Sequence, residues 1–248
     1  MTEPITSKSN PRLKELRKLH ERKHRDHTGL FLAEGEDMLA AALNHGHVPE
    51  TVYFDAAAAP ALPHDVEQVA VEREALDAAG TLGSGSRVVG VWRQVWSELD
   101  VPSVYLHDVA DPGNVGTIIR AAQAFGAGQV VLSRQTADPF GPKAVRAAMG
   151  AIFGQPVVRA SWEQARAAAG LAVALVPREG AALRELPLDR APMFVLGAER
   201  TGLPAEIVAA CDRTAHVPVG SADSLNVAMT ATLCLYEYSL RAAEARST

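Results

Sequence analysis

Short apolar runs alternate with helical patterns in the second half of the chain, and this alternation limits the possible folds more than any other feature. From Ser103 onward, runs such as Val104–His107, Gln129–Leu132 and Met193–Leu196 are typical of strands, and stretches with apolar residues three or four apart follow them. Strands that alternate with helices form mostly parallel sheets. The sequence therefore predicts an α/β fold with helices on both faces of a mostly parallel sheet.

Three later segments place glycine and polar residues directly after apolar runs. They are Asp111–Arg120, Leu196–Leu203 and Val217–Met229. In an open α/β sheet, ligands bind in the crevice beyond the carboxyl ends of the strands. We therefore expect the three segments to contribute to one site.

The glycine spacing disfavours an ordinary nucleotide-dependent enzyme with an open sheet. No Gly-x-Gly-x-x-Gly follows a strand and opens a helix, and the pair Gly83 and Gly85 lacks both a third glycine and the helix.

The first part of the chain has a different pattern, which predicts a small α/β domain. Asn10 can cap a helix with Pro11 at its first position, and leucines three residues apart follow. Glu36–Asn44 is predicted as a helix, and strands are expected at 51–54, 67–71 and 87–91. We predict one domain over residues 1–95 and a second over 101–248, whose last helix runs from Ser224 to Arg241.

The net charge of −5 is unevenly distributed. Lys8–Arg25 holds eight basic and two acidic residues, a net of +6, whereas the remainder holds 16 basic and 27 acidic residues, a net of −11. Such asymmetry indicates either a surface that meets phosphate or a solvated helix face.

The remaining composition excludes several classes of protein. No apolar run approaches the roughly 20 residues that span a bilayer, and the polar, basic N-terminus does not resemble a secretory signal. Cys211 and Cys234 are far apart, without a metal-ligand pattern, so we expect reduced thiols, no metal and a cytoplasmic protein.

The three segments, in this order, resemble the SpoU/TrmH family of RNA ribose 2′-O-methyltransferases. The matching residues are Asn114, Gly116 and Arg120 in the first, Gly197, Glu199 and Gly202 in the second, and Ser224, Leu225 and Asn226 in the third. In the N-terminal part, Ser9-Asn-Pro and Phe31-Leu-Ala-Glu-Gly resemble the substrate-binding domain of many SpoU enzymes that modify ribosomal RNA.

The resemblance implies methyl transfer from S-adenosylmethionine to a ribose 2′-hydroxyl of structured RNA, with ribosomal RNA as the substrate. It also implies a C-terminal trefoil knot that holds the cofactor, and a homodimer. Two alternatives stay open: a transfer RNA substrate, and an inactive relative that only binds RNA.

Arg120 is implied as the residue that activates the ribose hydroxyl. A guanidinium has a pKa above about 12 and is a poor base, so it is better suited to hold a phosphate beside the ribose. The alternative is an ion pair with Asp108 or Asp111. Asn114 would orient Arg120 or Glu199, or simply cap its helix.

Glu199 would fix Asn114, Arg120 or a substrate ribose, or would be a solvated loop residue. Ser224 and Asn226 would face the reaction centre, although Ser224 would also serve as a helix cap. Residues implied to contact the cofactor are Leu196, Gly197, Val217, Pro218, Leu225 and Asn226.

A further segment, Lys143–Gly150, resembles the family pattern Lys-x-x-Arg-x-Ser-x-Gly, with Ala148 where serine is usual. Arg146 would contact RNA phosphate. The complete set of expected RNA-binding residues is Arg12, Lys14, Arg17, Lys18, Arg22, Lys23, Arg25 and Arg146.

Overall fold

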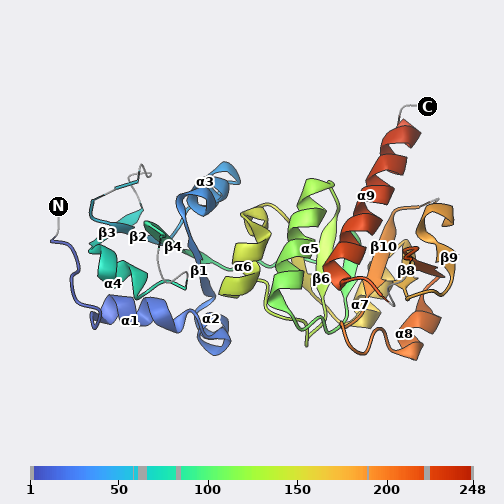
Figure 1. The fold of residues 1–248 in the computed structure, drawn as a ribbon, viewed down its shortest axis with the longest axis horizontal. Helices are drawn as coiled ribbons and strands as arrows, with labels where there is room; N and C mark the ends of the chain where they lie inside the picture. Colours follow the sequence, from blue (N-terminus) through green and yellow to red (C-terminus); the bar gives the residue numbers. More distant parts are fainter. Residues whose placement is uncertain are drawn as a thin grey trace. The chain divides into compact units, whose positions relative to one another are not determined.

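The computed structural model describes residues 3–57, 59–60, 66–81, 85–188, 190–220 and 224–246. The chain forms two compact units (Figure 1). The first unit comprises Met1–Val95 and Asp138–Gly154, and the second comprises Trp96–Ala137 and Gln155–Thr248. Two groups of residues named in the sequence analysis lie outside the described residues: 82–84, which include Gly83, and 221–223 of the third motif segment.

The first unit contains a four-stranded sheet with the order β1-β4-β2-β3. The strand β4 pairs antiparallel with both β1 and β2, and β2 pairs parallel with β3. The elements of this unit are α1 (Pro11–Lys18), α2 (Arg22–Thr28), β1 (Leu30–Glu34), α3 (Glu36–Asn44), β2 (Thr51–Asp55), β3 (Glu67–Val71), α4 (Arg73–Asp77), β4 (Val88–Arg93), α6 (Pro142–Ala148) and the 3-10 helix η1 (Ala151–Phe153).

The first helix begins where its capping residue predicts. The Asn10 side chain accepts a hydrogen bond from the Arg12 backbone N–H at 2.9 Å, and Pro11 takes the first helical position. The predicted leucine stripe, Leu13, Leu16 and Leu19, is buried against residues of the sheet. Helix α1 is therefore held by its apolar face.

Residues 138–154 belong to the first unit although they lie within the second half of the sequence. The buried Asp138 accepts hydrogen bonds from Arg25 Nη2 at 2.6 Å and Arg25 Nε at 2.9 Å. The ring of Phe31 packs against Phe140 and Phe153, with centroid distances of 5.0 and 5.8 Å. These long-range contacts attach α6 and η1 to β1.

The second unit contains a seven-stranded sheet with the order β7-β6-β5-β10-β8-β11-β9, in which every described pair is parallel. The predicted mostly parallel α/β architecture is confirmed. Its elements are β5 (Pro102–Leu106), α5 (Pro112–Ala124), β6 (Gln129–Leu132), β7 (Val157–Arg159), α7 (Trp162–Ala168), β8 (Leu171–Leu175), β9 (Ala181–Ala182), η2 (Leu183–Glu185), β10 (Pro192–Leu196), α8 (Ala205–Ala210), β11 (Arg213–His216) and α9 (Val227–Arg246).

Helices cover the sheet of the second unit on both faces. Tyr105, Val131 and Val195 pack with residues of α7 and α8 in one buried cluster. Because neighbouring strand residues point to opposite faces, Leu106 and Phe194 face the other side. Helices α5 and α9 contact each other there, and they also contact β6 and β10 respectively (Figure 1).

Two helices begin at other residues than the sequence indicated. Helix α5 starts at Pro112, with the Asp111 side chain accepting from the Gly113 N–H at 2.7 Å, so Asn114 is not the cap. Helix α9 starts at Val227 rather than Ser224. The Asn226 side chain accepts hydrogen bonds from the backbone N–H groups of Ala228 at 2.9 Å and Met229 at 3.2 Å. The cap is therefore Asn226, and the predicted cap at Ser224 is wrong.

The apolar residues of the last helix lie on two faces. Ala228 and Leu235 are buried in the core. Four large apolar side chains on the same helix are at least 39% exposed: Met229, Leu233, Tyr236 and Leu240. Among the described helices, none is both long enough and apolar enough to cross a bilayer.

Candidate active site

The second unit has a cavity of about 560 Å³ where β8, β10 and β11 end. Its walls come from the chain segments that follow these strands, at 175–178, 196–203, 216–219 and 224–230. Two of the three motif segments therefore line one cavity, at the carboxyl edge of a parallel sheet where ligands are expected.

A hydrogen-bonded network of three side chains joins all three motif segments at this cavity. Asn226 Nδ2 donates to Asn114 Oδ1 at 3.1 Å, and Asn114 Nδ2 donates to Glu199 Oε1 at 2.7 Å. Because Asn114 lies inside helix α5 rather than at its cap, its amide is available for both contacts. Of the two partners expected for Asn114, the described contacts join it to Glu199.

Glu199 is held as a carboxylate by this network. Partial burial acts to raise the pKa of Glu199, but the hydrogen bond from Asn114 and those from backbone N–H groups, including Ala110 at 3.4 Å, outweigh it and lower the pKa. The site therefore presents a negative charge at neutral pH, and hydrogen bonds hold the exposed Glu199 in place.

Two glycines shape the loop that carries Glu199. A Cβ added to Gly197 would lie 2.2–2.5 Å from backbone atoms of Gly202 and Leu203, so no side chain fits there. Gly202 has φ +68°, a left-handed conformation that favours glycine, and its N–H donates to the Ala198 carbonyl at 2.9 Å. The loop is a tight turn whose main chain closes on itself beside the cavity.

Most residues expected to contact a cofactor line the cavity. They are Leu196, Gly197, Val217, Leu225 and Asn226. Pro218 does not belong to the lining. The exposed Ser224 does line the cavity, beside Asn226.

Arg120 lies on α5, with an exposed side chain that is not part of the cavity lining. Among the described residues it makes no ion pair with Asp108 or Asp111. Asp108 instead accepts a hydrogen bond from Ser133 Oγ at 2.6 Å. The guanidinium of Arg120 is thus presented to solvent, where an incoming phosphate can reach it.

The motifs did not identify three further residues that line the cavity: Arg178, His216 and Thr230. Arg178 has φ +61°, unusual for a residue with a side chain, and follows β8. The only sequence signal for it is its position after an apolar run, which many loop residues share.

The basic residues of α1 and α2 largely have partners. Arg12 pairs with Glu67, Lys18 with Glu15 at 2.7 Å, and Arg22 with Asp26 at 3.6 Å, all on the surface. Arg17 donates to the Lys8 carbonyl at 2.9 Å. Lys14 and Lys23 are exposed, and no described residue pairs with them.

Arg25 is 4% exposed. Besides its bonds to Asp138, it donates to the carbonyl groups of Leu19 and His20 at 2.8 and 2.9 Å. Because a buried and saturated guanidinium cannot reach phosphate, the expected RNA contact at Arg25 is wrong. Arg146, by contrast, is exposed on α6.

Two family models match the chain. The SpoU rRNA methylase family matches residues 102–236, and the MRM3-like substrate-binding domain matches residues 10–95.

Among curated proteins, the chain is 34% identical to the 23S rRNA (guanosine(2553)-2′-O)-methyltransferase RlmP of Bacillus subtilis, over 94% of this chain and 97% of that protein. It is 32% identical to the 23S rRNA (uridine(2479)-2′-O)-methyltransferase of Streptomyces viridochromogenes, over 88% and 85%.

Two solved structures with bound AdoMet are similar over nearly their whole length. The rRNA methyltransferase from Sinorhizobium meliloti is 31% identical, with a TM-score of 0.83 over 97% of this chain and 98% of that one. The SpoU methyltransferase AviRb from Streptomyces viridochromogenes is 28% identical, with a TM-score of 0.81 over 94% and 98%. The shared motifs, the full-length sequence similarity and the common fold agree, and the chain belongs to the SpoU rRNA methylase family.

Proposed function

We propose that this protein transfers a methyl group from S-adenosylmethionine to the 2′-hydroxyl of a ribose in ribosomal RNA. The observation that carries the proposal is the network of Asn226, Asn114 and Glu199, which ties three distant motif segments together beside one cavity. Family membership and the two 23S rRNA methyltransferases among its relatives support the same reaction and substrate.

The cavity suits S-adenosylmethionine. Its volume of about 560 Å³ falls within the usual range for cofactor sites. Leu196, Val219 and Leu225 offer apolar walls for a flat ring, and the turn at Gly197 brings main-chain groups to the surface. When bound, the cofactor supplies an electrophilic methyl group.

The residues of the chain position the two reactants. Methyl transfer to a hydroxyl requires close, collinear alignment and a route for the hydroxyl proton. We assign Arg120 to hold a phosphate next to the reacting ribose, because its planar fork of N–H donors matches phosphate and its high pKa makes it a poor base. Asn114 and Glu199 fix α5 against the loop after β10, which sets the position of Arg120.

Seven basic side chains of the first unit are proposed to bind the RNA backbone. They are Arg12, Lys14, Arg17, Lys18, Arg22 and Lys23 on α1 and α2, with Arg146 on α6. Arg17 is half-buried, and three others have surface carboxylate partners that phosphate would have to displace.

We also propose a homodimer formed through α9. Met229, Leu233, Tyr236 and Leu240 are spaced four, three and four residues apart, so they form one apolar stripe on the exposed side of the helix. Light scattering should give twice the 26.3 kDa chain mass, and Leu233→Asp should give the single-chain mass. A wild-type mass of one chain at micromolar concentration would refute the dimer.

The family resemblance supports two further proposals, on the C-terminal topology and on the cellular compartment. We propose that the C-terminal part of the second unit forms the trefoil knot implied by the resemblance. We further propose action in the cytoplasm. The free thiols Cys211 and Cys234 suit a reducing compartment, since burial raises the pKa of Cys211 to about 11 and also raises that of Cys234, leaving both unreactive.

The reaction is tested with purified protein, methyl-labelled S-adenosylmethionine and unmodified ribosomal RNA. We expect one 2′-O-methylated nucleotide in the product RNA, located by mass spectrometry of nuclease fragments, and the loss of that same mark in a strain that lacks the gene. Label in transfer RNA instead would support the alternative substrate. Cofactor binding by calorimetry without transfer to either RNA would leave an inactive relative.

A further inference from the structure

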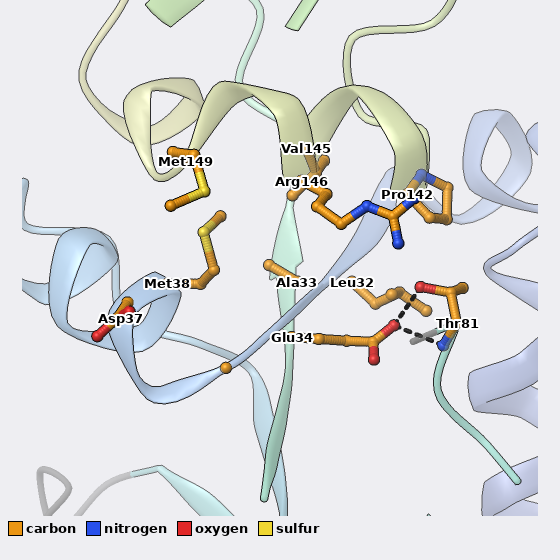
Figure 2. Close-up of a pocket in the computed structure, with 11 residues that line it drawn as sticks. Leu32, Ala33, Glu34, Asp37, Met38, Thr81, Pro142, Val145, Arg146 and Met149 are labelled. Carbon is orange, nitrogen blue, oxygen red and sulfur yellow. Dashed lines mark hydrogen bonds between the residues drawn. The ribbon is translucent and has the colours of Figure 1, made fainter. Parts of the chain in front are cut away.

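The first unit contains a second cavity, of about 190 Å³, that the proposed transfer reaction does not use. It lies between β1, α3 and α6 (Figure 2). Figure 2 shows Met38 and Met149 facing each other at one end, with Arg146 and Glu34 toward the other. The cavity thus combines apolar walls with one basic side chain, Arg146, and two acidic side chains, Glu34 and Asp37.

The cavity is assembled from distant parts of the chain and held firmly. The buried ion pair between Arg25 and Asp138 attaches the segment that carries α6 to the N-terminal helices. A Cβ added to Gly150, at φ +88°, would lie 2.6 Å from the Ala41 Cβ, so the turn after α6 packs directly on α3. The two methionines therefore face each other across a preformed gap.

Met149 occupies an unusual position for its residue type. It ends α6 in the left-handed conformation, with φ 49° and ψ 47°, yet it is 58% exposed. That conformation costs a non-glycine residue about 1–2 kcal/mol, and glycine is the usual residue there. A large, strained and exposed apolar side chain contributes little to the core, and the contact it offers is in the cavity wall.

Methionine is suited to contact flat π systems, because its polarizable sulfur packs favourably against aromatic rings. A cavity of about 190 Å³ is smaller than the usual sites for drug-sized ligands and has room for a single flat group between Met38 and Met149.

The polar end of the cavity can bind the edge of a nucleobase and a phosphate. Glu34 Oε1 accepts hydrogen bonds from the Thr81 backbone N–H at 2.6 Å and from the Thr81 hydroxyl, which fix the carboxylate in place. A carboxylate accepts hydrogen bonds from N–H groups. Each of the four standard nucleobases has at least one N–H group on its pairing edge. The exposed guanidinium of Arg146 is a phosphate ligand.

We propose that this cavity binds one unpaired nucleobase of the RNA substrate, with its face between Met38 and Met149, its N–H edge toward Glu34 and its phosphate on Arg146. This inference rests on the proposed RNA function and adds a second point of recognition in the first unit. Sequence-specific recognition of RNA mostly uses unpaired bases whose faces and edges are accessible. The cavity would thereby select RNA with an extruded base at a set position.

The five methionines of the chain provide a direct test. In protein labelled with ¹³C at the methionine methyl groups, ring currents from a bound base should shift the signals of Met38 and Met149. Met193, buried in the second unit, serves as the internal control. The probes are the four nucleoside 5′-monophosphates and a ribosomal RNA fragment, with ribose 5-phosphate as the control for phosphate binding alone.

We expect Met38 and Met149 to shift with at least one nucleotide and with the RNA, and to stay unchanged with ribose 5-phosphate. Unshifted signals of these two residues in a sample where fluorescence anisotropy shows bound RNA would overturn the proposal.

A variant test measures the contribution to RNA binding. Met149→Gly removes the side chain and relieves the left-handed conformation, so folding should be kept, while RNA affinity should fall about 2- to 10-fold. Met149→Leu should keep most of the affinity. Val48→Ala, which trims another exposed apolar side chain of the first unit, is the matched control and should change nothing.

The outcomes separate this proposal from the proposed reaction. Methyl transfer to RNA by the wild type, together with unchanged RNA affinity of Met149→Gly, would overturn only the base-binding cavity. Absence of RNA binding and of methyl transfer in the wild type would overturn both.

Discussion

Polar residues are prominent at the cavity rim of the second unit and on the α1–α2 face of the first unit, but their partners differ. The α1–α2 face is the set of basic residues between Lys8 and Arg25. At the rim, Asn114 bonds to residues 85 and 112 positions away, and the three side chains form one network. On the α1–α2 face, Lys8, Arg12, Lys18 and Arg22 have carboxylate partners on the surface, and Arg25 is buried in an ion pair.

A motif and a charge count therefore carry different information about a fold. Motif residues mark the ends of strands, and parallel strands bring those ends to one edge of the sheet. A net charge of +6 says nothing about which cations already have partners, because the partners come from elsewhere in the fold.

Arg120→Ala should lower the single-turnover methyl-transfer rate at saturating RNA by about 10²- to 10⁴-fold, because an aligned group at the reacting ribose is lost. Cofactor affinity by calorimetry should stay nearly unchanged. Arg120→Lys should rescue little, since an ammonium lacks the planar fork. Arg134→Ala, another exposed arginine of the second unit, is the control. A variant that keeps even a third of the wild-type rate would make Arg120 structural.

Arg25→Ala should destabilise the protein by about 3–5 kcal/mol, because Asp138 is left as a buried charge without its partner. Urea unfolding followed by circular dichroism measures this loss. Arg22→Ala removes an exposed pair with Asp26 and should cost less than about 1 kcal/mol. Equal effects of the two substitutions would mean that burial does not distinguish these arginines.

Gly197→Ala should weaken S-adenosylmethionine binding at least about tenfold, or 1.4 kcal/mol, because the added Cβ would collide with the main chain of the turn. Gly170→Ala is the matched control, since its added Cβ would meet only the Ala191 carbonyl oxygen, at 3.9 Å. Wild-type affinity of the Gly197 variant would show that the turn does not shape the cofactor site.

Glu199→Gln tests the charge at the rim. Since the folded state lowers the pKa of Glu199 below its ordinary value of 4.5, the carboxylate contributes stability above that value, which is lost as the pH falls through the folded-state pKa. The stability difference between wild type and variant should therefore shrink from about pH 6 to about pH 3. In an Asn114→Ala background the shrinkage should be smaller. A difference independent of pH would contradict the network.

Lys14→Gln should reduce the slope of log affinity for RNA against log salt by about 0.7–0.9, the value for one phosphate contact. Arg12→Gln should reduce it less, because Arg12 already pairs with Glu67. Removal of all residues before Gly29 would not test this point, since it would also delete the buried Leu13, Leu16 and Leu19. Equal slopes for wild type and Lys14→Gln would identify the α1–α2 face as a solvated helix surface.

Local patterns in the sequence predicted much of the architecture and the chain segments that form the site. The Asn10 cap, the leucine stripe of α1 and the bounds of α3 follow from nearest-neighbour chemistry and periodicity. Helix α7 was missed although Ser161 and Gln164 form a capping box, a signal that was present in the sequence. The start of α5 was misassigned because both Asp111 and Asn114 are good caps and only the backbone geometry distinguishes them.

Local sequence patterns were sufficient to predict the alternating α/β plan, the mostly parallel sheet and the three segments beside the cavity, because periodicity and turn chemistry are local properties. The folded structure was needed to show that residues 138–154 join the first unit, that Arg25 is buried with Asp138, and that Asn114 bonds to Glu199 and Asn226. Each of these depends on contacts between residues far apart in the chain. Such contacts form when buried polar groups find partners, and no pattern of neighbouring residues specifies which partner that will be.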